Sequence, residues 1–240
     1  YYIKTTNQEG YVLVFDFKKY FESIPHELIL KILHKNYTDQ RIVDLIMQFV
    51  KFSNNDRGID LGSQISQVLA LAVANEIDHI IKEKLRFKCY GRYMDDGCMI
   101  DNNKEWLKMC KDVINSCAIR LGLTLNLKKT RIVKLSKGFV FLKNKYRVID
   151  NRLLITPTKD STVRIRRRLK KLNKKLINRE IEYNDILQSY QAWTAHLNGT
   201  RCYKTIQSMS CLFDKLFIDS FAVDYDRFMI TGGGELCIIK

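Results

Sequence analysis

The sequence lacks any apolar stretch long enough to cross a membrane. Its longest apolar run extends only from Val68 to Ala74, whereas a membrane-spanning helix needs about 20 consecutive apolar residues. No secretory signal is visible in it either. We therefore expect no membrane partner and a cytoplasmic location.

The cysteines lack the spacing of a zinc-binding or disulfide-rich domain. There are seven of them, an odd number, and no two form a Cys-x-x-Cys pair. This pattern disfavours both a zinc site and a disulfide framework, so reduced thiols are the simplest interpretation.

Acidic residues are scarce relative to basic ones. The 240 residues include 41 Lys and Arg against 26 Asp and Glu, which gives a formal net charge of +15. This excess favours a polyanionic partner, and nucleic acid is the first candidate. A basic ribosomal protein or a membrane-surface protein would share the charge. The hydrophobic fraction of 46% is enough for a buried core in one or two domains.

Two of the few acidic residues are adjacent. Asp95 and Asp96 follow Tyr93 and Met94, between short apolar stretches at 87–93 and 97–100 that are typical of strands. Neighbouring carboxylates at the tip of a hairpin repel each other, and divalent cations bound by hard oxygen ligands remove that repulsion. A solvated Asp-Asp turn is the alternative interpretation.

A third carboxylate follows another predicted strand. Asp16 comes directly after the apolar run from Tyr11 to Phe15, and a residue at the end of a strand is placed to reach into a crevice. Alone it could be an ordinary turn aspartate. Together with Asp95 and Asp96 it indicates a two-metal site for phosphoryl transfer.

Five segments in this order resemble the polymerase motifs A to E of reverse transcriptases, and they cover about residues 10 to 145. The overall resemblance is to prokaryotic reverse transcriptases, most of all to the class of diversity-generating retroelements and group II introns. The five segments are residues 14–26, 57–67, 93–96, 123–130 and 138–142.

The resemblance implies an α+β fold: a right-hand polymerase palm, with an antiparallel sheet and flanking helices, followed by a helical thumb. We expect the palm with partial fingers at 1–157, the thumb at 158–222 and a C-terminal tail at 223–240. The fingers are expected to be largely missing, so this stretch could be inactive on its own. The residue patterns predict strands at 10–16, 139–142, 146–149 and 152–155, and helices at 24–35 with Ser23 as cap, 39–52, 66–84, 104–121, 160–178, 183–198 and 200–217.

The resemblance also implies catalytic roles. Asp16 and Asp95, with the backbone carbonyl of Phe17, would hold two Mg²⁺ ions, for which Mn²⁺ can substitute, and the charge of Asp96 would be needed beside them. Lys129 matches a lysine that can protonate the leaving pyrophosphate, although a surface lysine is an equally good interpretation.

Further residues are expected to contact the nucleotide and the nucleic acid. Phe21 matches a steric gate that excludes ribonucleotides, a simple core aromatic being the alternative. Tyr93 and Met94 would pack near the primer terminus. The segment at the start of the motif B helix would meet the template and the incoming nucleotide through Leu61, Gly62 and Gln64.

The first thumb helix is predicted to bind the template–primer duplex. Its basic residues lack acidic partners at helical spacing, and phosphates would offset their mutual repulsion. A solvated charged face is the alternative. The phosphate-binding candidates are Arg164, Arg167, Arg168 and Lys171, and the predicted buried stripe is Val163, Leu169, Leu172 and Leu176.

Some positions depart from the family pattern. Leu61 stands where intron enzymes carry glutamine, as in diversity-generating enzymes of low fidelity. Lys143 replaces a glycine in motif E, and Gly97 replaces a bulky residue after the paired aspartates.

The expected function is RNA-directed DNA polymerase, extending a DNA or RNA primer with dNTPs on an RNA template, with a structured RNA and an accessory protein as further partners. The alternatives are an antiphage-defence or intron-type reverse transcriptase, an RNA-dependent RNA polymerase, and a non-catalytic RNA-binding scaffold.

Overall fold

The computed structural model describes residues 9–50, 56–149, 152–195, 197 and 202–230, with side chains up to residue 217. The chain divides into two compact units: one comprises 1–142 and 147–153, and the other 143–146 and 154–240. The predicted α+β class is confirmed, because helices accompany antiparallel sheet. The predicted domain limits remain predictions.

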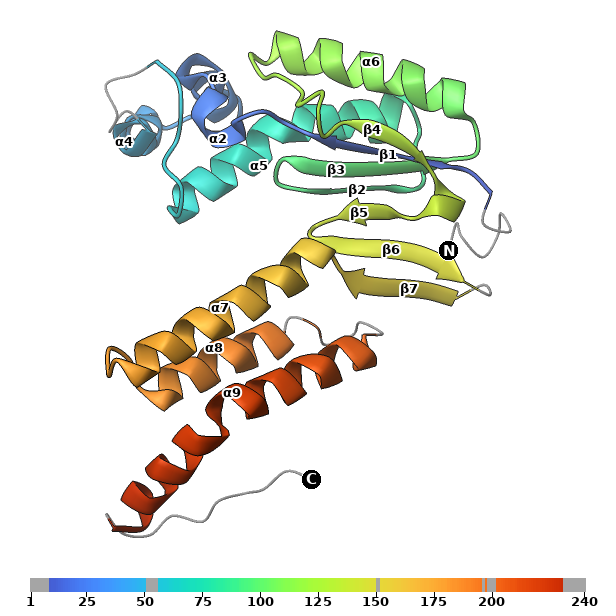
Figure 1. Ribbon diagram of the computed structural model, residues 1–240. Helices are drawn as coiled ribbons and strands as arrows, with labels where there is room; N and C mark the ends of the chain where they lie inside the picture. Colours follow the sequence, from blue (N-terminus) through green and yellow to red (C-terminus); the bar gives the residue numbers. More distant parts are fainter. Residues whose placement is uncertain (1–8, 51–55, 150–151, 196, 198–201, 231–240) are drawn as a thin grey trace. The chain divides into compact units, whose positions relative to one another are not determined.

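An antiparallel sheet of four strands organises the first unit, in the order β2-β3-β1-β4 (Figure 1). The strands are β1 (Tyr11–Asp16), β2 (Tyr90–Tyr93), β3 (Asp96–Asp101) and β4 (Arg131–Lys134). The pattern of strand residues did not predict β4, which is short and only partly buried. It pairs with β1 on the side opposite β3.

Both faces of β1 are covered, which explains why its sequence is a continuous apolar run. Leu13 and Phe15 belong to the main core with the helices, whereas Val12 and Val14 pack on the other face with Leu135. The helices of this unit are α2 (Tyr20–Ser23), α3 (His26–Asn36), α4 (Gln40–Val50), α5 (Gln64–His79) and α6 (Lys104–Arg120), with a π-helix at Ile80–Lys84 after α5.

The start of α3 differs from the prediction. Ser23 does not cap this helix, because it ends the preceding turn α2 and its hydroxyl donates to the Tyr20 carbonyl at 2.9 Å. Pro25 takes the N-cap position instead. At the other end of the unit, α6 ends as predicted at Gly122, whose φ of +73° suits glycine.

A three-stranded sheet follows, in the order β5-β6-β7. Its strands are β5 (Phe139–Phe141), β6 (Asn144–Ile149) and β7 (Arg152–Pro157). The turn between β5 and β6 forms without the family's glycine, since Leu142 and Lys143 both adopt positive φ, 47° and 63°. Two positive φ values are the geometry of a tight hairpin turn of type I′.

The second unit contains three helices among the described residues: α7 (Lys159–Ile177), α8 (Tyr183–Ala195) and α9 (Tyr203–Ile230). Its core includes Leu169, Ile186 and Phe213, one from each helix. The third helix continues past its predicted end at residue 217. The ends of the predicted helices at 198 and 200 lie outside the described residues, as do 51, 52 and the last ten residues of the predicted tail.

Gly97 is explained by close packing. It pairs with Phe15 across β1 and β3, and a Cβ atom at Gly97 would lie 2.2–2.6 Å from three atoms at the end of the Phe15 ring. No carbon atoms approach that closely without displacement. Phe15 and Gly97 are therefore a matched pair.

We predict that Gly97→Ala lowers the free energy of unfolding by about 3 kcal/mol, the upper range for overpacking a core. Phe15→Leu removes the clashing ring atoms, so the double variant should lose less than the two single variants together, by about 1–3 kcal/mol. Urea denaturation measures each value.

Gly91→Ala is the matched control for this pair. Its added Cβ would meet only the Cys98 sulfur, at 4.0 Å, and we expect a change within about 0.5 kcal/mol. A fully additive double variant would contradict the packing explanation.

Candidate active site

Strand pairing brings two of the predicted catalytic residues together. Asp16 ends β1 and Asp96 begins β3, and the two are direct partners in the antiparallel register. The Asp16 carbonyl accepts a hydrogen bond from the Asn126 N–H at 2.7 Å, on the β4 side of β1. Asp16 and Asp96 therefore form a non-hydrogen-bonded pair, the kind in which side chains approach most closely. The Asp16 carboxylate contributes to the raised pKa of Asp96, which indicates that the two carboxyl groups lie close together.

The third aspartate lies in the turn of the same hairpin. Met94 and Asp95 form the two-residue connection between β2 and β3, and Met94 adopts a positive φ of 51°. This places Asp95 directly beside Asp96. The three aspartates predicted from the sequence thus gather at one end of two neighbouring strands.

Burial and mutual repulsion raise the pKa of two of these carboxyl groups. Partial burial is the main reason that the pKa of Asp96 rises to about 6, and the charges of Asp95 and Asp16 raise it further. The pKa of Asp95 is also raised, first by burial and then by Asp16. Negative charge at this site is therefore unfavourable until a cation compensates it.

Two side chains from the segment before β4 donate to Asp16. Lys129 Nζ lies 2.6 Å from Asp16 Oδ2, and Asn126 Nδ2 donates to Asp16 Oδ1 at 3.0 Å. The hydrogen bond to Asp16 is the main reason that the pKa of Lys129 is raised. Asp16 itself is only 3% exposed, so these donors satisfy a buried carboxylate.

Asn126 was not identified from the sequence as a site residue. The available signal was its position as a polar residue within the pattern Leu123, Leu125, Leu127. Leu123 and Leu125 are buried, whereas Leu127 is largely exposed, so Asn126 follows a buried apolar anchor and lies next to Asp16.

The orientation of the Phe17 carbonyl follows from the hydrogen bonds of its neighbours. Along a β-strand the N–H and C=O groups of successive residues point to opposite sides. Asp16 directs its carbonyl toward Asn126, and Phe17 forms a bridge with Leu125 in which its neighbours make the hydrogen bonds. The Phe17 carbonyl therefore points toward the β3 side, where Asp95 lies.

The donors present suit a hard divalent cation. Carboxylate and carbonyl oxygens are the ligands that Mg²⁺ and Mn²⁺ prefer. The raised pKa values of Asp95 and Asp96 show that their charged forms are disfavoured, first by burial and then by the neighbouring carboxylates. No group of three or more His, Cys, Asp or Glu side chains in the described part of the chain is already arranged around a metal position. Of the three aspartates, Asp16 is instead bonded to Lys129 and Asn126.

The structure distinguishes the two adjacent aromatic residues of motif A, Tyr20 and Phe21. Tyr20 is buried, and its hydroxyl donates to the Ala70 carbonyl of α5 at 2.6 Å. Phe21 is only partly buried and meets the Tyr20 ring edge-on, with 5.8 Å between ring centroids. Tyr20 therefore has a structural role, and the Phe21 ring retains an open side.

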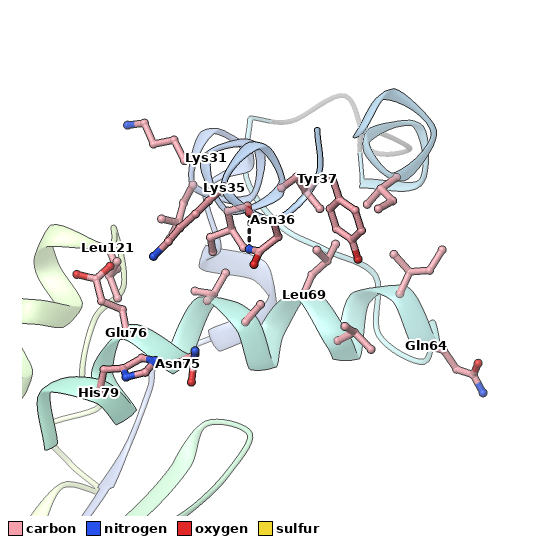
Figure 2. A pocket seen from close by; sticks show the side chains of 18 residues that line it. Lys31, Lys35, Asn36, Tyr37, Gln64, Leu69, Asn75, Glu76, His79 and Leu121 are labelled. Atoms are coloured by element: carbon pink, nitrogen blue, oxygen red, sulfur yellow. Dashed lines mark hydrogen bonds between the residues drawn. The ribbon is translucent and has the colours of Figure 1, made fainter. Parts of the chain in front are cut away.

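The three motif B candidates lie at the start of α5. Leu61 is 76% exposed, and Gly62 has a positive φ of 99° with open space around it. Gln64 is at the rim of a pocket of about 920 Å³ between α3 and α5 (Figure 2). No hydrogen bond or ion pair within the described residues joins these three to the aspartates, and their role remains a prediction.

The basic candidates lie on α7, in the second unit. Arg164, Arg167, Arg168 and Lys171 are exposed, and among the described residues none of them forms an ion pair. At 100° per residue these four positions fall on one face of the helix. The predicted buried stripe needs one correction: Val163 is 39% exposed, and Ile165 is buried in its place. Ile165 precedes Leu169 by one helical turn, whereas Val163 lies on the far side of the helix.

A comparison with known families identifies the class of the chain. The model of the family described as reverse transcriptase (RNA-dependent DNA polymerase) matches residues 1–145. The chain belongs to this family, whose members are nucleotidyltransferases. The predicted family is thereby confirmed.

Individual relatives are distant. Protein YkfC of Escherichia coli (strain K12) is 24% identical over 176 residues, which cover 55% of this chain and 45% of that protein. The chain thus spans less than half the length of this curated relative.

Solved telomerase structures share the fold. The apo telomerase of Candida tropicalis, truncated from its C-terminal domain, is 15% identical with a TM-score of 0.50, covering 65% of this chain and 37% of that one. The telomerase of Candida albicans in complex with a TWJ fragment of telomeric RNA is 12% identical with a TM-score of 0.50, covering 90% of this chain and 44% of that one.

No described helix is both long enough and apolar enough to span a membrane.

We predict that Mg²⁺ stabilises the protein through the aspartate cluster. At ten times its dissociation constant, the bound cation should add about 1.4 kcal/mol, which raises Tm by about 3–5 °C for a chain of this size. In the Asp95→Asn, Asp96→Asn double variant this gain should vanish, while Tm without metal should rise because the repulsion is relieved. Differential scanning calorimetry with EDTA or Mg²⁺ measures both.

The control carries the same change of charge at exposed helical positions, Asp44→Asn with Asp112→Asn. It should keep the full response to Mg²⁺. An equal Mg²⁺ response in the two double variants would contradict a cation site at the hairpin.

Proposed function

We propose that this protein is an RNA-directed DNA polymerase that extends a primer with dNTPs on an RNA template by two-metal catalysis. The observation that carries the proposal is the gathering of Asp16, Asp95 and Asp96 at the paired ends of β1 and β3. It occurs in a chain of the reverse transcriptase family. Three carboxylates close together provide the oxygen ligands and the negative charge that two divalent cations need.

The aspartates and the Phe17 carbonyl would hold the cations. When bound, two Mg²⁺ ions lower the pKa of the primer 3′-hydroxyl and neutralise the triphosphate and the leaving pyrophosphate. Asp16 is pre-positioned by Asn126, whose side chain and backbone both bond to it. Preorganised ligands avoid the cost of ordering them during catalysis.

Lys129 would act as the proton donor to pyrophosphate. Its ammonium group lies beside Asp16, and the raised pKa keeps the proton on Nζ at neutral pH. Its side chain is largely exposed, so it can turn from the carboxylate toward a leaving group. A positioned general acid typically contributes 10²- to 10⁴-fold to a rate.

Phe21 would act as the steric gate of the nucleotide site. The anchoring of Tyr20 to Ala70 leaves Phe21 as the motif A aromatic with an open side. A bulky ring against the sugar excludes a 2′-hydroxyl by overlap. This favours DNA synthesis over RNA synthesis.

Nucleic acid would bind through the basic face of α7. Arg164, Arg167, Arg168 and Lys171 have no acidic partners in the described ion pairs, and the chain as a whole carries a charge of +15. Phosphate binding releases counterions and is favoured by such a face. Tyr93, which is 64% exposed, and Met94 would pack near the primer terminus. A structured RNA and an accessory protein remain proposed partners.

Low fidelity is the proposed specialisation. Leu61 is exposed in motif B, shortly before α5, and its aliphatic side chain cannot offer a polar contact to the nascent base pair. Losing one polar contact weakens discrimination between bases. Diversity generation at template adenines is therefore favoured over defence or intron mobility as the biological role.

The direct test is primer extension by the natural full-length protein on an RNA template of mixed sequence, with Mg²⁺ and dNTPs. We expect extension that is lost by at least 10³-fold in the Asp95→Asn, Asp96→Asn double variant, with errors concentrated at template adenines. The Asp44→Asn, Asp112→Asn variant should extend normally. Tight RNA binding without any extension would refute the polymerase and favour an RNA-binding scaffold.

The gate has its own test, the ratio of dNTP to rNTP incorporation. Phe21→Val should raise the use of rNTPs by about 10- to 200-fold, the range for changing pocket size by one group, with dNTP use nearly unchanged. Tyr20→Phe, which removes only the hydroxyl bonded to Ala70, should leave the ratio as it is. Equal shifts in both variants would show that Phe21 is no gate.

A further inference from the structure

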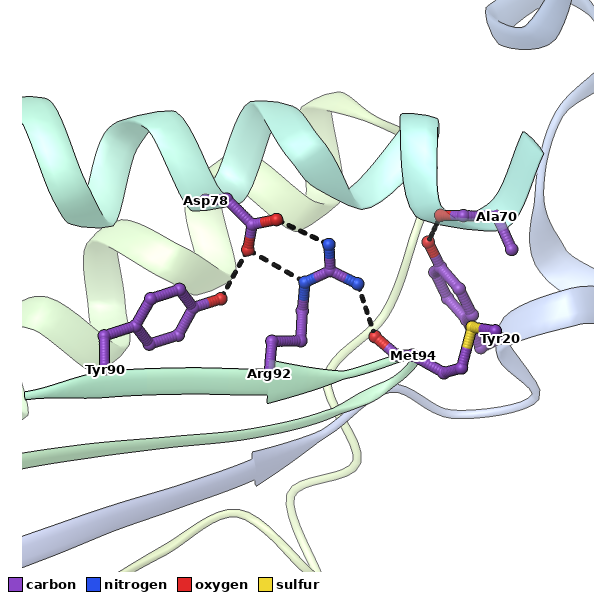
Figure 3. Close-up of polar contacts among 6 residues, drawn as sticks. All are labelled: Tyr20, Ala70, Asp78, Tyr90, Arg92 and Met94. Atoms are coloured by element: carbon purple, nitrogen blue, oxygen red, sulfur yellow. Dashed lines mark hydrogen bonds and ion pairs between the residues drawn. The ribbon is translucent and has the colours of Figure 1, made fainter. Parts of the chain in front are cut away.

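Arg92 lies next to the Met94–Asp95 turn, which is called the catalytic turn below, and it does not belong to any predicted site. It is in β2, and its side chain is only 8% exposed. A buried guanidinium is costly unless all its donors are engaged. Figure 3 shows where its three nitrogen atoms point: two toward α5 and one toward the turn.

The α5 partner is Asp78. Arg92 Nε and Nη2 donate to the two Asp78 oxygens at 2.8 and 2.5 Å, and the Tyr90 hydroxyl donates to the same carboxylate at 2.5 Å. Burial disfavours the charge on Asp78, but the bonds from Arg92 and Tyr90 outweigh it and lower the pKa of that carboxyl. Arg92 and Asp78 therefore stay ionised, and the two parallel bonds between them fix the orientation of the planar guanidinium group.

The remaining nitrogen reaches the catalytic turn. Arg92 Nη1 donates to the Met94 carbonyl at 2.8 Å. The peptide bond at that carbonyl continues into Asp95, and Met94 has the positive φ that most residues avoid. One side chain thus joins α5 to the strained residue next to a proposed metal ligand.

We propose that Arg92, held by Asp78, is a positioning residue that sets the place of the Met94–Asp95 turn relative to α5. This inference rests on the proposed function, because it assigns to Arg92 the correct placement of the Asp95 carboxylate for a divalent cation. Arg92 itself touches neither cation nor substrate.

The same helix also holds motif A. The Tyr20 hydroxyl donates to Ala70 of α5 at 2.6 Å, two turns before Asp78 (Figure 3). Asp16 and Asp95 thus both lie close in sequence to a residue anchored on α5. A displacement of the Arg92 guanidinium would therefore move the Asp95 carboxylate and leave the Asp16 carboxylate in place.

Lysine cannot replace arginine in this role. A single ammonium group cannot make a planar two-pronged bond to Asp78 and also reach the Met94 carbonyl. Arg92→Lys therefore keeps the charge and removes the geometry. Arg120→Lys is the matched control, because Arg120 forms an exposed ion pair with Glu76 of the same helix, α5.

The test measures Mn²⁺ affinity of the free protein by electron paramagnetic resonance and then the kinetics of primer extension. For Arg92→Lys we expect at least 10-fold weaker Mn²⁺ binding and a 10- to 100-fold lower kcat, the effect of a displacement of about 1 Å. KM for dNTP should change little, whereas Tm should fall by a few degrees because the partly buried Asp78 carboxylate loses part of its hydrogen bonding. Arg120→Lys should match the wild type in all four quantities.

Two outcomes separate the inference from the proposed function. Wild-type protein that binds Mn²⁺ but extends no primer would refute the polymerase, while the Mn²⁺ comparison would still decide the role of Arg92. Unchanged Mn²⁺ affinity in folded Arg92→Lys would overturn the inference. If that variant does not fold, Asp78→Asn, which keeps the shape but not the charge, must weaken Mn²⁺ binding in the same way, and unchanged binding there would equally overturn it.

Discussion

The register between β1 and β3 is the constraint on which the site depends. It places Asp16 opposite Asp96 and, one residue along, Phe15 opposite Gly97. The ring of Phe15 fills the space that any side chain at position 97 would need. A slip of one residue would turn every side chain of β1 to the wrong face, so the core packing and the carboxylate cluster are fixed together.

The cluster of Asp16, Asp95 and Asp96 concentrates negative charge, which is unfavourable, and the surrounding fold holds the three residues together. Burial raises the pKa of Asp95 and Asp96, and their repulsion adds to this. Asp16 is held by Lys129 and Asn126, which are more than 100 residues distant in sequence. The turn is joined to α5 by Arg92. Such local conflict with stability is expected where function requires it.

The sequence predicted what depends on local patterns. Residue periodicity predicted the long helices, and local motifs predicted the apolar strand β1 and the paired aspartates of the hairpin. The family resemblance supplied the catalytic roles of these aspartates. Asn126 and Arg92 escaped prediction because their importance comes from partners far along the chain, Asp16 and Asp78. The prediction for Val163 was wrong because this residue precedes Leu169 by six residues, which is not a whole number of helical turns. The short strand β4 has too little apolar pattern to be recognised.

The most direct measurement is a crystal structure of the protein soaked in Mn²⁺, with the ions located by anomalous scattering. We expect anomalous peaks bounded by carboxylate oxygens of Asp16 and Asp95 and by the Phe17 carbonyl, with Asp96 beside them and Lys129 released from Asp16. Mn²⁺ peaks elsewhere on the protein, with Asp16 still bonded to Lys129, would contradict a catalytic cation site built by the pairing of β1 and β3.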